Sequence, residues 1–204
     1  MTNLKIATFP QQAADICWAS SLIYTRGLVC AAGGNISSRC NDVMLITGTN
    51  VSLRNVQNKN LALCDLQGIV LDAAEGTRPS KEMKFHSGIY LVRPQVQCII
   101  HAHPCYSTVW SMQHKQLPMY TESAKLKLKQ VPIISDAKPG TQELADSVIN
   151  TVSEASDDVT AFLLANHGII VLGKTMEECI NTTELLEDTA KIAVYQELLT
   201  HARS

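Results

Sequence analysis

The stretch Cys98-Ile99-Ile100-His101-Ala102-His103-Pro104 ends an apolar run with two histidines spaced two residues apart. The apolar run predicts a buried strand, in which side chains at positions i and i+2 point to the same face. Both imidazoles therefore converge on one point, a geometry that suits a metal ion. On spacing alone, the alternative is a pair of core histidines with ordinary hydrogen-bond partners.

A third histidine, His167, lies in "LLANHGIIV" between two apolar runs and is followed by Gly168. It is expected at a strand end, where a backbone turn can direct the side chain inward. Three neutral imidazoles leave a tetrahedral Zn²⁺ with at least one open position, as in catalytic zinc sites. The sequence thus predicts one divalent ion, expected to be zinc, bound by His101, His103 and His167.

Glu82 in "PSKEMKFH" is the candidate titratable partner of this site. Ser80 is the predicted N-cap of a helix through "KEMKFHSGIYLV", which Arg93-Pro94 ends. Glu82 then lies at the helix start, with His86 one turn later on the same face. Glu82 is either a general acid/base or an acidic residue favoured there by the helix dipole, and the residues alone favour the second. His86 is expected in the core or behind the ligands, not as a fourth ligand.

Two glycine-containing turns, "AAGGNISSR" and "LITGTN", lie next to predicted strands. Their Asn, Ser and Thr groups and exposed backbone N–H groups could bind a phosphate or another oxyanion. Neither turn is a GxGxxG motif or a P-loop. A simple tight-turn role for the glycines is the equal alternative.

The remaining pattern predicts an α/β fold with a mainly antiparallel sheet covered by helices on both faces. Helices are expected from Pro10 to Gly27 and, capped by Thr175, from "TMEE" to near "LLTHARS". Further strands are expected at 28–32, 43–47, 61–65, 68–72, 160–166 and 168–173.

The whole chain has the composition of one soluble domain, residues 1–204. Its 204 residues are 46% hydrophobic, with a formal net charge of -2 and a pI near 6.3. Neither nucleic acid nor a membrane is an expected partner, because basic residues form no long run and no segment reaches the roughly eighteen apolar residues of a membrane span. No secretory leader is recognised, so a cytoplasmic protein is expected. Seven scattered cysteines predict no disulfide framework, and most are expected to be buried.

Taken in order, five motifs resemble the class II aldolase and adducin head family: "GGNISSR", "ITGTN", "RPSKEMKFH", "IIHAHP" and "LLANHGIIVLGKT". The resemblance spans nearly the whole chain. It implies a three-layer αβα fold with a central, mainly antiparallel sheet, a divalent zinc site, and usually a homotetramer with active sites near subunit contacts. The implied substrate is a small phosphorylated keto sugar or sugar acid.

Carried over residue by residue, the resemblance makes His101, His103 and His167 the zinc ligands and Glu82 the catalytic acid/base. It places the phosphate pocket at Gly34, Asn35, Thr47, Gly48 and Ser80. The implied reaction is carbon–carbon lysis, in which zinc holds the electrons of the broken bond as an enediolate. Aldol cleavage, as in L-fuculose-1-phosphate aldolase, is the first expectation.

Departures from the family pattern keep other activities open. Lys81 in "PSKE" resembles the branch that decarboxylates 3-oxo-tetronate 4-phosphates, and its charge could hold a carboxylate or phosphate. Tyr120 only approximately matches a catalytic tyrosine of the aldolases, and the chain is expected to end before their second one. Pentulose-phosphate 4-epimerases have Asp where this chain has Glu82. A non-catalytic adducin-like interaction module is the last alternative, against which the joint presence of three histidines and Glu82 weighs.

Overall fold

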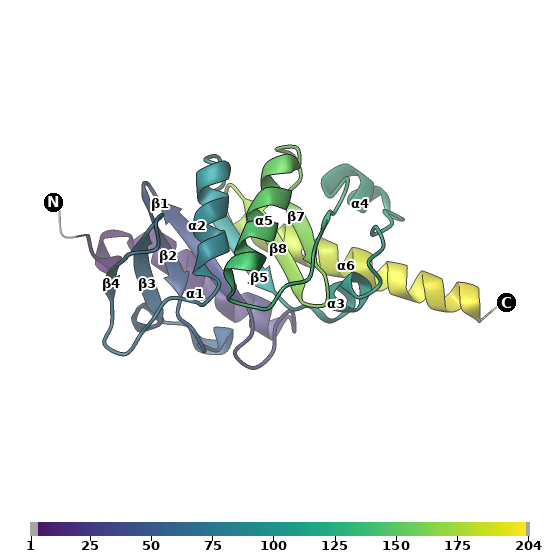
Figure 1. Cartoon of the computed structure of the whole chain (residues 1–204). Coiled ribbons are helices and arrows are strands. Elements are labelled where there is room, and N and C mark those ends of the chain that lie inside the picture. The colour runs from purple at the N-terminus through teal and green to yellow at the C-terminus, as the bar shows by residue number, and fades with distance from the viewer. Residues whose placement is uncertain (1–3, 203–204) are drawn as a thin grey trace.

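The central feature of the structure is one sheet of eight strands. The computed structural model describes residues 4–202. Its strands are β1 (Asn35–Cys40), β2 (Val43–Thr47), β3 (Leu61–Asp65), β4 (Val70–Ala73), β5 (Cys98–Ala102), β6 (Ile133–Ile134), β7 (Ala161–Leu164) and β8 (Gly168–Gly173). Their order is β4-β3-β2-β1-β5-β8-β7-β6 (Figure 1). All neighbours are antiparallel except β6 and β7, which confirms the predicted mainly antiparallel sheet.

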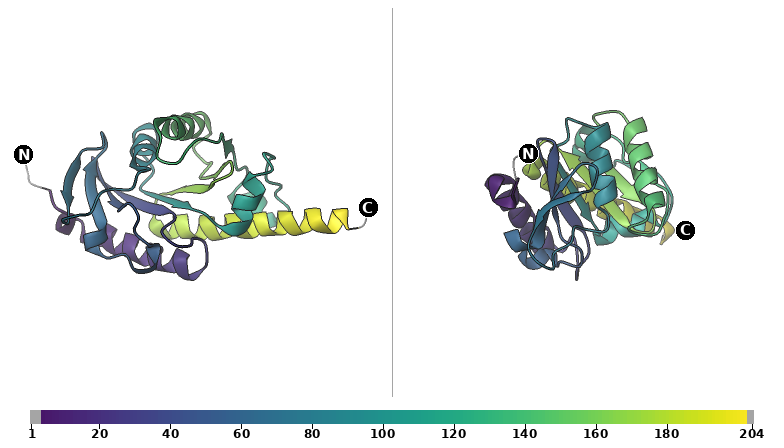
Figure 2. Two further views of the ribbon diagram at one scale, coloured as in Figure 1. Left: turned by 60° about the horizontal axis from the view of Figure 1, so that its bottom comes forward. Right: turned by 60° about the vertical axis from the view of Figure 1, so that its left-hand side comes forward.

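Helices cover both faces of this sheet and make three layers (Figure 2). The helices are α1 (Pro10–Thr25), α2 (Met83–Val92), α3 (Cys105–Ser111), α4 (Glu122–Lys127), α5 (Gln142–Glu154) and α6 (Met176–His201), with short 3-10 turns η1 (Ile6–Thr8), η2 (Leu53–Asn55) and η3 (Asn58–Asn60). One apolar core joins the sheet to α1, α3, α4 and α6, and a second joins it to α2 and α5. The predicted three-layer αβα fold is therefore confirmed.

The strand predicted at 28–32 is wrong. These residues form turns after α1, where the Leu28 N–H donates to the Ile23 carbonyl and the Gly33 N–H to the Cys30 carbonyl. Leu28 and Val29 are apolar because they enter the core, not because they pair in the sheet. The strand lies instead at β1, whose polar sequence is paired on both sides by β2 and β5.

Helix α2 begins later than predicted, at Met83, with Glu82 and not Ser80 at the cap position. The Ser80 hydroxyl accepts the Glu82 N–H at 3.3 Å, so Ser80 closes the turn that precedes the helix. At its other end, α2 is tied to α5 by the buried Arg93. Its guanidinium donates to four carbonyls at and beyond the end of α5, those of Val152, Ala155, Ser156 and Val159. The two helices are thus held side by side.

Within residues 4–202, no helix combines the length and apolar character needed to cross a membrane. The seven cysteines are free thiols, four of them buried, as predicted for most. Cys17 is half-buried, and Cys30 and Cys105 are exposed.

Candidate active site

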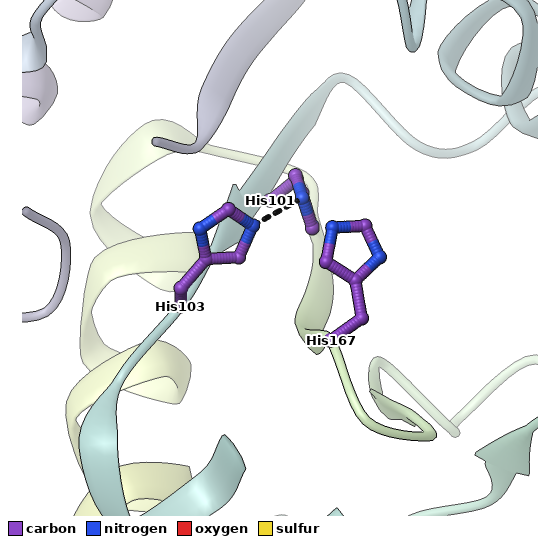
Figure 3. Close-up of side chains that lie close together, drawn as sticks. All are labelled: His101, His103 and His167. Atoms are coloured by element: carbon purple, nitrogen blue, oxygen red, sulfur yellow. Dashed lines mark hydrogen bonds between the residues drawn. The ribbon is translucent and has the colours of Figure 1, made fainter. Parts of the chain in front are cut away.

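The three predicted metal ligands meet at the junction of β5, β7 and β8. His101 lies in β5, His103 follows directly after it, and His167 stands in the turn between β7 and β8. Because β5 and β8 are paired, with Ala102 opposite Ile169, the turn is brought against the end of β5. All three rings face one centre (Figure 3), and one potential ligand atom from each lies within 4.8 Å of the others.

The hydrogen bonding of His101 shows which atoms face this centre. Its Nδ1 donates to the Ile169 carbonyl at 2.9 Å, which turns Nε2 toward the other rings. That Nε2 lies 2.9 Å from Nε2 of His103. Two ring nitrogens at this distance require a proton or a cation between them.

Glu82 extends over the same centre from the start of α2. Its Oε2 accepts from Asn35 Nδ2 at 2.8 Å and lies 3.2 Å from His101 Nε2. Its Oε1 lies 3.6 Å from His167 Nε2 and, buried, has no hydrogen-bond partner within residues 4–202. Three converging imidazoles beside a buried, partly unpartnered carboxylate are a donor set that fits a divalent ion.

Burial and the mutual charges of these groups set their protonation. Burial disfavours the Glu82 carboxylate, but attraction to His101 and hydrogen bonds from His101 and Asn35 hold its pKa below the usual range. Burial opposes the imidazolium of His101, yet Glu82 and the Ile169 carbonyl raise its pKa. Burial and then His101 lower the pKa of His103 to about 3 and that of His167 to about 4. His103 and His167 are therefore neutral near pH 7, as metal ligands must be.

Two glycines allow the backbone to close around the histidines. Gly34 has φ +75°, and a Cβ there would lie 2.8 Å from the His101 carbonyl oxygen. A Cβ at Gly168 would lie 2.3 Å from the Ala102 carbonyl oxygen and 2.7 Å from the His103 ring. At both positions a side chain would clash with a neighbouring carbonyl oxygen, so glycine is required there for steric reasons and not only to form a turn.

A cavity of about 420 Å³ opens in front of the histidines. It is lined by residues 32–35, 48–50, 80–82 and 139–140, together with His103 and His167. The predicted oxyanion residues Gly34, Asn35, Gly48, Ser80 and Lys81 all contribute to this lining. The Gly48 N–H, however, donates to the Asn60 carbonyl. Gly48 therefore forms part of the cavity wall, but its N–H is not available to bind a phosphate.

Two predicted residues lie away from the cavity. Thr47 is buried behind it, and the Ile36 N–H donates to its hydroxyl at 3.1 Å. Tyr120 is 51% exposed, on the segment between α3 and α4, and does not line the cavity of its own chain.

Sequence reasoning missed other lining residues. Thr49 and Asn50 belong to the quoted "LITGTN" turn, in which only Thr47 and Gly48 were singled out. Pro139 and Gly140 also line the cavity. The Pro-Gly dipeptide is a turn signal. No local pattern, however, indicated that this turn folds over Lys81, whose Cβ lies 3.2 Å from the position that a Cβ at Gly140 would take.

The chain is similar to known proteins over most of its length. A family model described as Class II Aldolase and Adducin N-terminal domain matches residues 14–194. An L-fuculose phosphate aldolase of Methanococcus vannielii is 33% identical over 171 residues, which are 84% of this chain and 89% of that protein. A 3-oxo-tetronate 4-phosphate decarboxylase of Haemophilus influenzae is 31% identical over 175 residues, 83% of this chain and 80% of that protein.

Solved structures show the same likeness. The crystal structure of L-fuculose-1-phosphate aldolase from Thermus thermophilus superimposes with a TM-score of 0.83 at 26% identity, covering 95% of this chain and 97% of that one. By its match to the family model and by these relatives, the chain belongs to the class II aldolase and adducin family.

Proposed function

We propose that this chain is a divalent-metal-dependent carbon–carbon lyase that cleaves a small phosphorylated keto sugar by the aldol route. The observation that carries the proposal is the cluster of three imidazoles with the Glu82 carboxylate beside it, of which His103, His167 and Glu82 line one cavity. The relative named L-fuculose phosphate aldolase supports the reaction class. A pure interaction module would have no use for four such groups in one cluster.

In this proposal His101, His103 and His167 hold the ion, taken to be zinc. Such an ion supplies Lewis-acid stabilisation, worth several kcal/mol, for the negative charge that develops on substrate oxygens as the carbon–carbon bond breaks. Glu82 moves the proton at the reacting carbon. Its Oε2 is held by Asn35, whereas Oε1, 3.6 Å from His167 Nε2, has no hydrogen-bond partner among residues 4–202, and we assign the proton exchange to Oε1.

The anionic end of the substrate is proposed to bind in the cavity near Gly34 and Ser80. The Ser80 oxygen accepts the Glu82 N–H. Its own O–H is therefore available to donate to a phosphate oxygen. Lys81, exposed at the cavity, adds a positive charge. Thr49 and Asn50 line the same cavity.

Decarboxylation of a 3-oxo-tetronate 4-phosphate is the second candidate. The observation that favours it is Lys81, because a substrate with both a carboxylate and a phosphate requires an additional positive charge. The Haemophilus influenzae relative carries that activity in its name. Epimerisation of a pentulose phosphate is the third candidate; it would use the same metal chemistry with a different acid/base pair.

The homotetramer is also part of the proposal. Helix α6 extends past the sheet (Figure 1), and Tyr195, Leu198 and Leu199 are exposed in its C-terminal part. Apolar side chains on a projecting helix support a subunit contact. Tyr120, exposed and outside its own cavity, would act in catalysis only across such a contact. A reducing, cytoplasmic setting agrees with the free thiols of all seven cysteines.

A product screen tests the function. The purified protein is loaded separately with Zn²⁺, Co²⁺ and Mn²⁺ and incubated with ketose 1-phosphates, pentulose phosphates and 3-oxo acid phosphates. An aldehyde fragment identifies an aldolase, released CO₂ a decarboxylase, and an inverted carbon an epimerase. The proposal is overturned if the loaded protein breaks no carbon–carbon bond in any of these substrates.

A further inference from the structure

Behind Glu82, a chain of buried hydrogen bonds leads away from the cavity and is not used by the proposed mechanism. Asn35 Nδ2 lies 2.8 Å from Glu82 Oε2, and Asn35 Oδ1 lies 2.5 Å from His86 Nε2. His86 Nδ1 is 2.7 Å from the Ser37 hydroxyl, which is 2.8 Å from the Tyr90 hydroxyl. His86, Ser37 and Tyr90 are fully buried.

The residue spacing in α2 and β1 brings these hydrogen-bonded side chains together. Glu82, His86 and Tyr90 recur every four residues from the start of α2, so they lie on one face of the helix. Asn35 and Ser37 are two apart in β1 and share one face of the strand. The chain therefore fills the seam between α2 and the sheet, next to the proposed catalytic carboxylate.

Because Glu82 is ionised, the donor and the acceptor of each hydrogen bond in this row can be assigned. A carboxylate only accepts, so Asn35 must present its NH₂ to Glu82 and its oxygen to His86. His86 must then carry its proton on Nε2, which leaves Nδ1 to accept from Ser37. The Ser37 oxygen in turn accepts from Tyr90. Burial, followed by the charge of His101, lowers the pKa of His86 to about 3, in agreement with a neutral ring.

We propose that His86 is a positioning residue that fixes the Asn35 amide, and through it the Glu82 carboxylate. Without the His86 Nε2–H, the Asn35 Oδ1 loses its buried donor, so the amide is held only by its contact with Glu82 and is no longer fixed in place. The carboxylate then loses the fixed N–H that holds Oε2 beside His101 and Oε1 beside His167. The inference rests on the proposed catalytic role of Glu82.

The ring tautomer gives a first test that requires no substrate. A long-range ¹H–¹⁵N NMR spectrum of the zinc-loaded protein at pH 7 is expected to show His86 as the neutral Nε2–H form. Assignment comes from the signal lost in His86→Gln. A neutral Nδ1–H form or an imidazolium would overturn the proposal, whether or not the protein proves to be a lyase.

Variants give the second test, because a purely structural His86 predicts a different pattern. His86→Leu is expected to lower kcat about 10- to 100-fold, the usual scale for a residue that orients a site from behind. Its KM and zinc content should stay within about twofold of wild type. His86→Gln, whose amide can place an N–H near the Nε2 position, is expected to recover most of kcat.

Ser87→Ala is the matched control. Ser87 is the next residue of α2 and is also buried, and among the described residues its hydroxyl donates to the Lys84 carbonyl and to no group of the site, so this variant should keep kcat. Equal kcat in His86→Leu and Ser87→Ala would overturn the positioning role, as would equal losses in His86→Leu and His86→Gln. If His86→Leu does not fold, the positioning role is tested by the kcat of His86→Gln and by the NMR measurement of the His86 tautomer. If the wild-type protein breaks no carbon–carbon bond, the proposed function fails. The NMR measurement of the His86 tautomer is then the test that remains for the proposed hydrogen-bond directions.

Discussion

Glu82 makes no cap hydrogen bond with the helix it precedes, although helix-dipole stabilisation was the simpler explanation of an acidic residue there. Its two oxygens are directed instead at Asn35, His101 and His167. Glu82→Gln keeps the shape of the side chain but cannot accept and return a proton. We expect kcat to fall by about 10²-fold or more, with KM and zinc content near wild type. A steady-state rate equal to wild type would reduce Glu82 to a structural residue.

The metal ligands give a prediction that needs no substrate. His101 is the central ring, fully buried and within reach of both other histidines. His101→Ala should therefore lose the ion, measured as metal per subunit after gel filtration. At 100 times its Kd, zinc should stabilise the wild-type fold by about 2.7 kcal/mol and the variant not at all. His114→Asn, at an exposed histidine with φ +52°, is the control that should retain the metal. Full zinc content in His101→Ala would contradict the site.

Lys81 separates the two candidate substrates. Lys81 is exposed and lines the cavity, so its side chain can meet an anionic group without the cost of burial. If it holds a carboxylate, Lys81→Met should reduce kcat/KM for a 3-oxo acid phosphate by about tenfold or more and have a much smaller effect on a neutral-headed ketose phosphate. Equal effects on both substrates would assign Lys81 to the shared phosphate. No effect on either would make it an ordinary surface residue.

At the scale of elements, the contact between α2 and α5 holds Glu82 in place. A Cβ at Gly88 would lie 2.2 Å from Ile149 Cδ1 and 2.5 Å from its Cγ1. Gly88→Ala gains about 1 kcal/mol of helix propensity but overpacks this contact, which costs about 1–3 kcal/mol. We expect a net loss in the free energy of unfolding, measured by urea denaturation. In an Ile149→Ala background the same change should become stabilising. The same sign in both backgrounds would exclude steric coupling of the two helices.

The elements that the sequence predicted well are those whose signals are local. The Thr175 cap accepts the Glu178 N–H, as its motif predicts, and α6 follows from it. Strand β1 was missed because its polar residues look unlike a buried strand. Asn35 and Ser37 are polar because they bond to Glu82, His86 and Tyr90 from α2, partners that lie far away in the sequence. Tertiary bonding there overrides strand propensity.

In the candidate site too, the features with a local sequence signal were predicted, and those set by distant contacts were not. The spacing of His101 and His103 in a predicted strand indicated their convergence, which holds although β5 ends at Ala102, and the structure brings His167 to them. The fit of Pro139 and Gly140 over Lys81 depends on where the loop after β6 returns to α2, which no local pattern specifies. Thr47 shows the converse case, because a hydroxyl in a promising turn is occupied by the backbone of β1.

At the scale of the whole molecule, the histidines make the stability of the metal-free fold depend on pH. Burial is the first cause of the low pKa values of His86, His103 and His167, about 3, 3 and 4, against an ordinary 6.5. At a pH between the folded-state pKa of each of these histidines and its ordinary pKa of 6.5, the unfolded chain binds more protons than the folded one. Stability is therefore fully present above pH 6.5 and is lost as the pH falls. His101, whose pKa is raised, has the opposite sign, and its contribution is lost as the pH rises above 6.5.

We therefore expect the free energy of unfolding of the metal-free protein to decrease steadily from pH 6.5 to about 4.5, before the carboxylates begin to protonate. Urea denaturation at half-unit steps of pH measures this slope. His86→Gln should make it shallower, because one of the three groups no longer titrates. Zinc-loaded protein should show a steeper slope, because protons then also compete with the metal for the ligands. A flat profile in the metal-free protein over this range would mean that the three imidazoles do not resist protonation in the folded state.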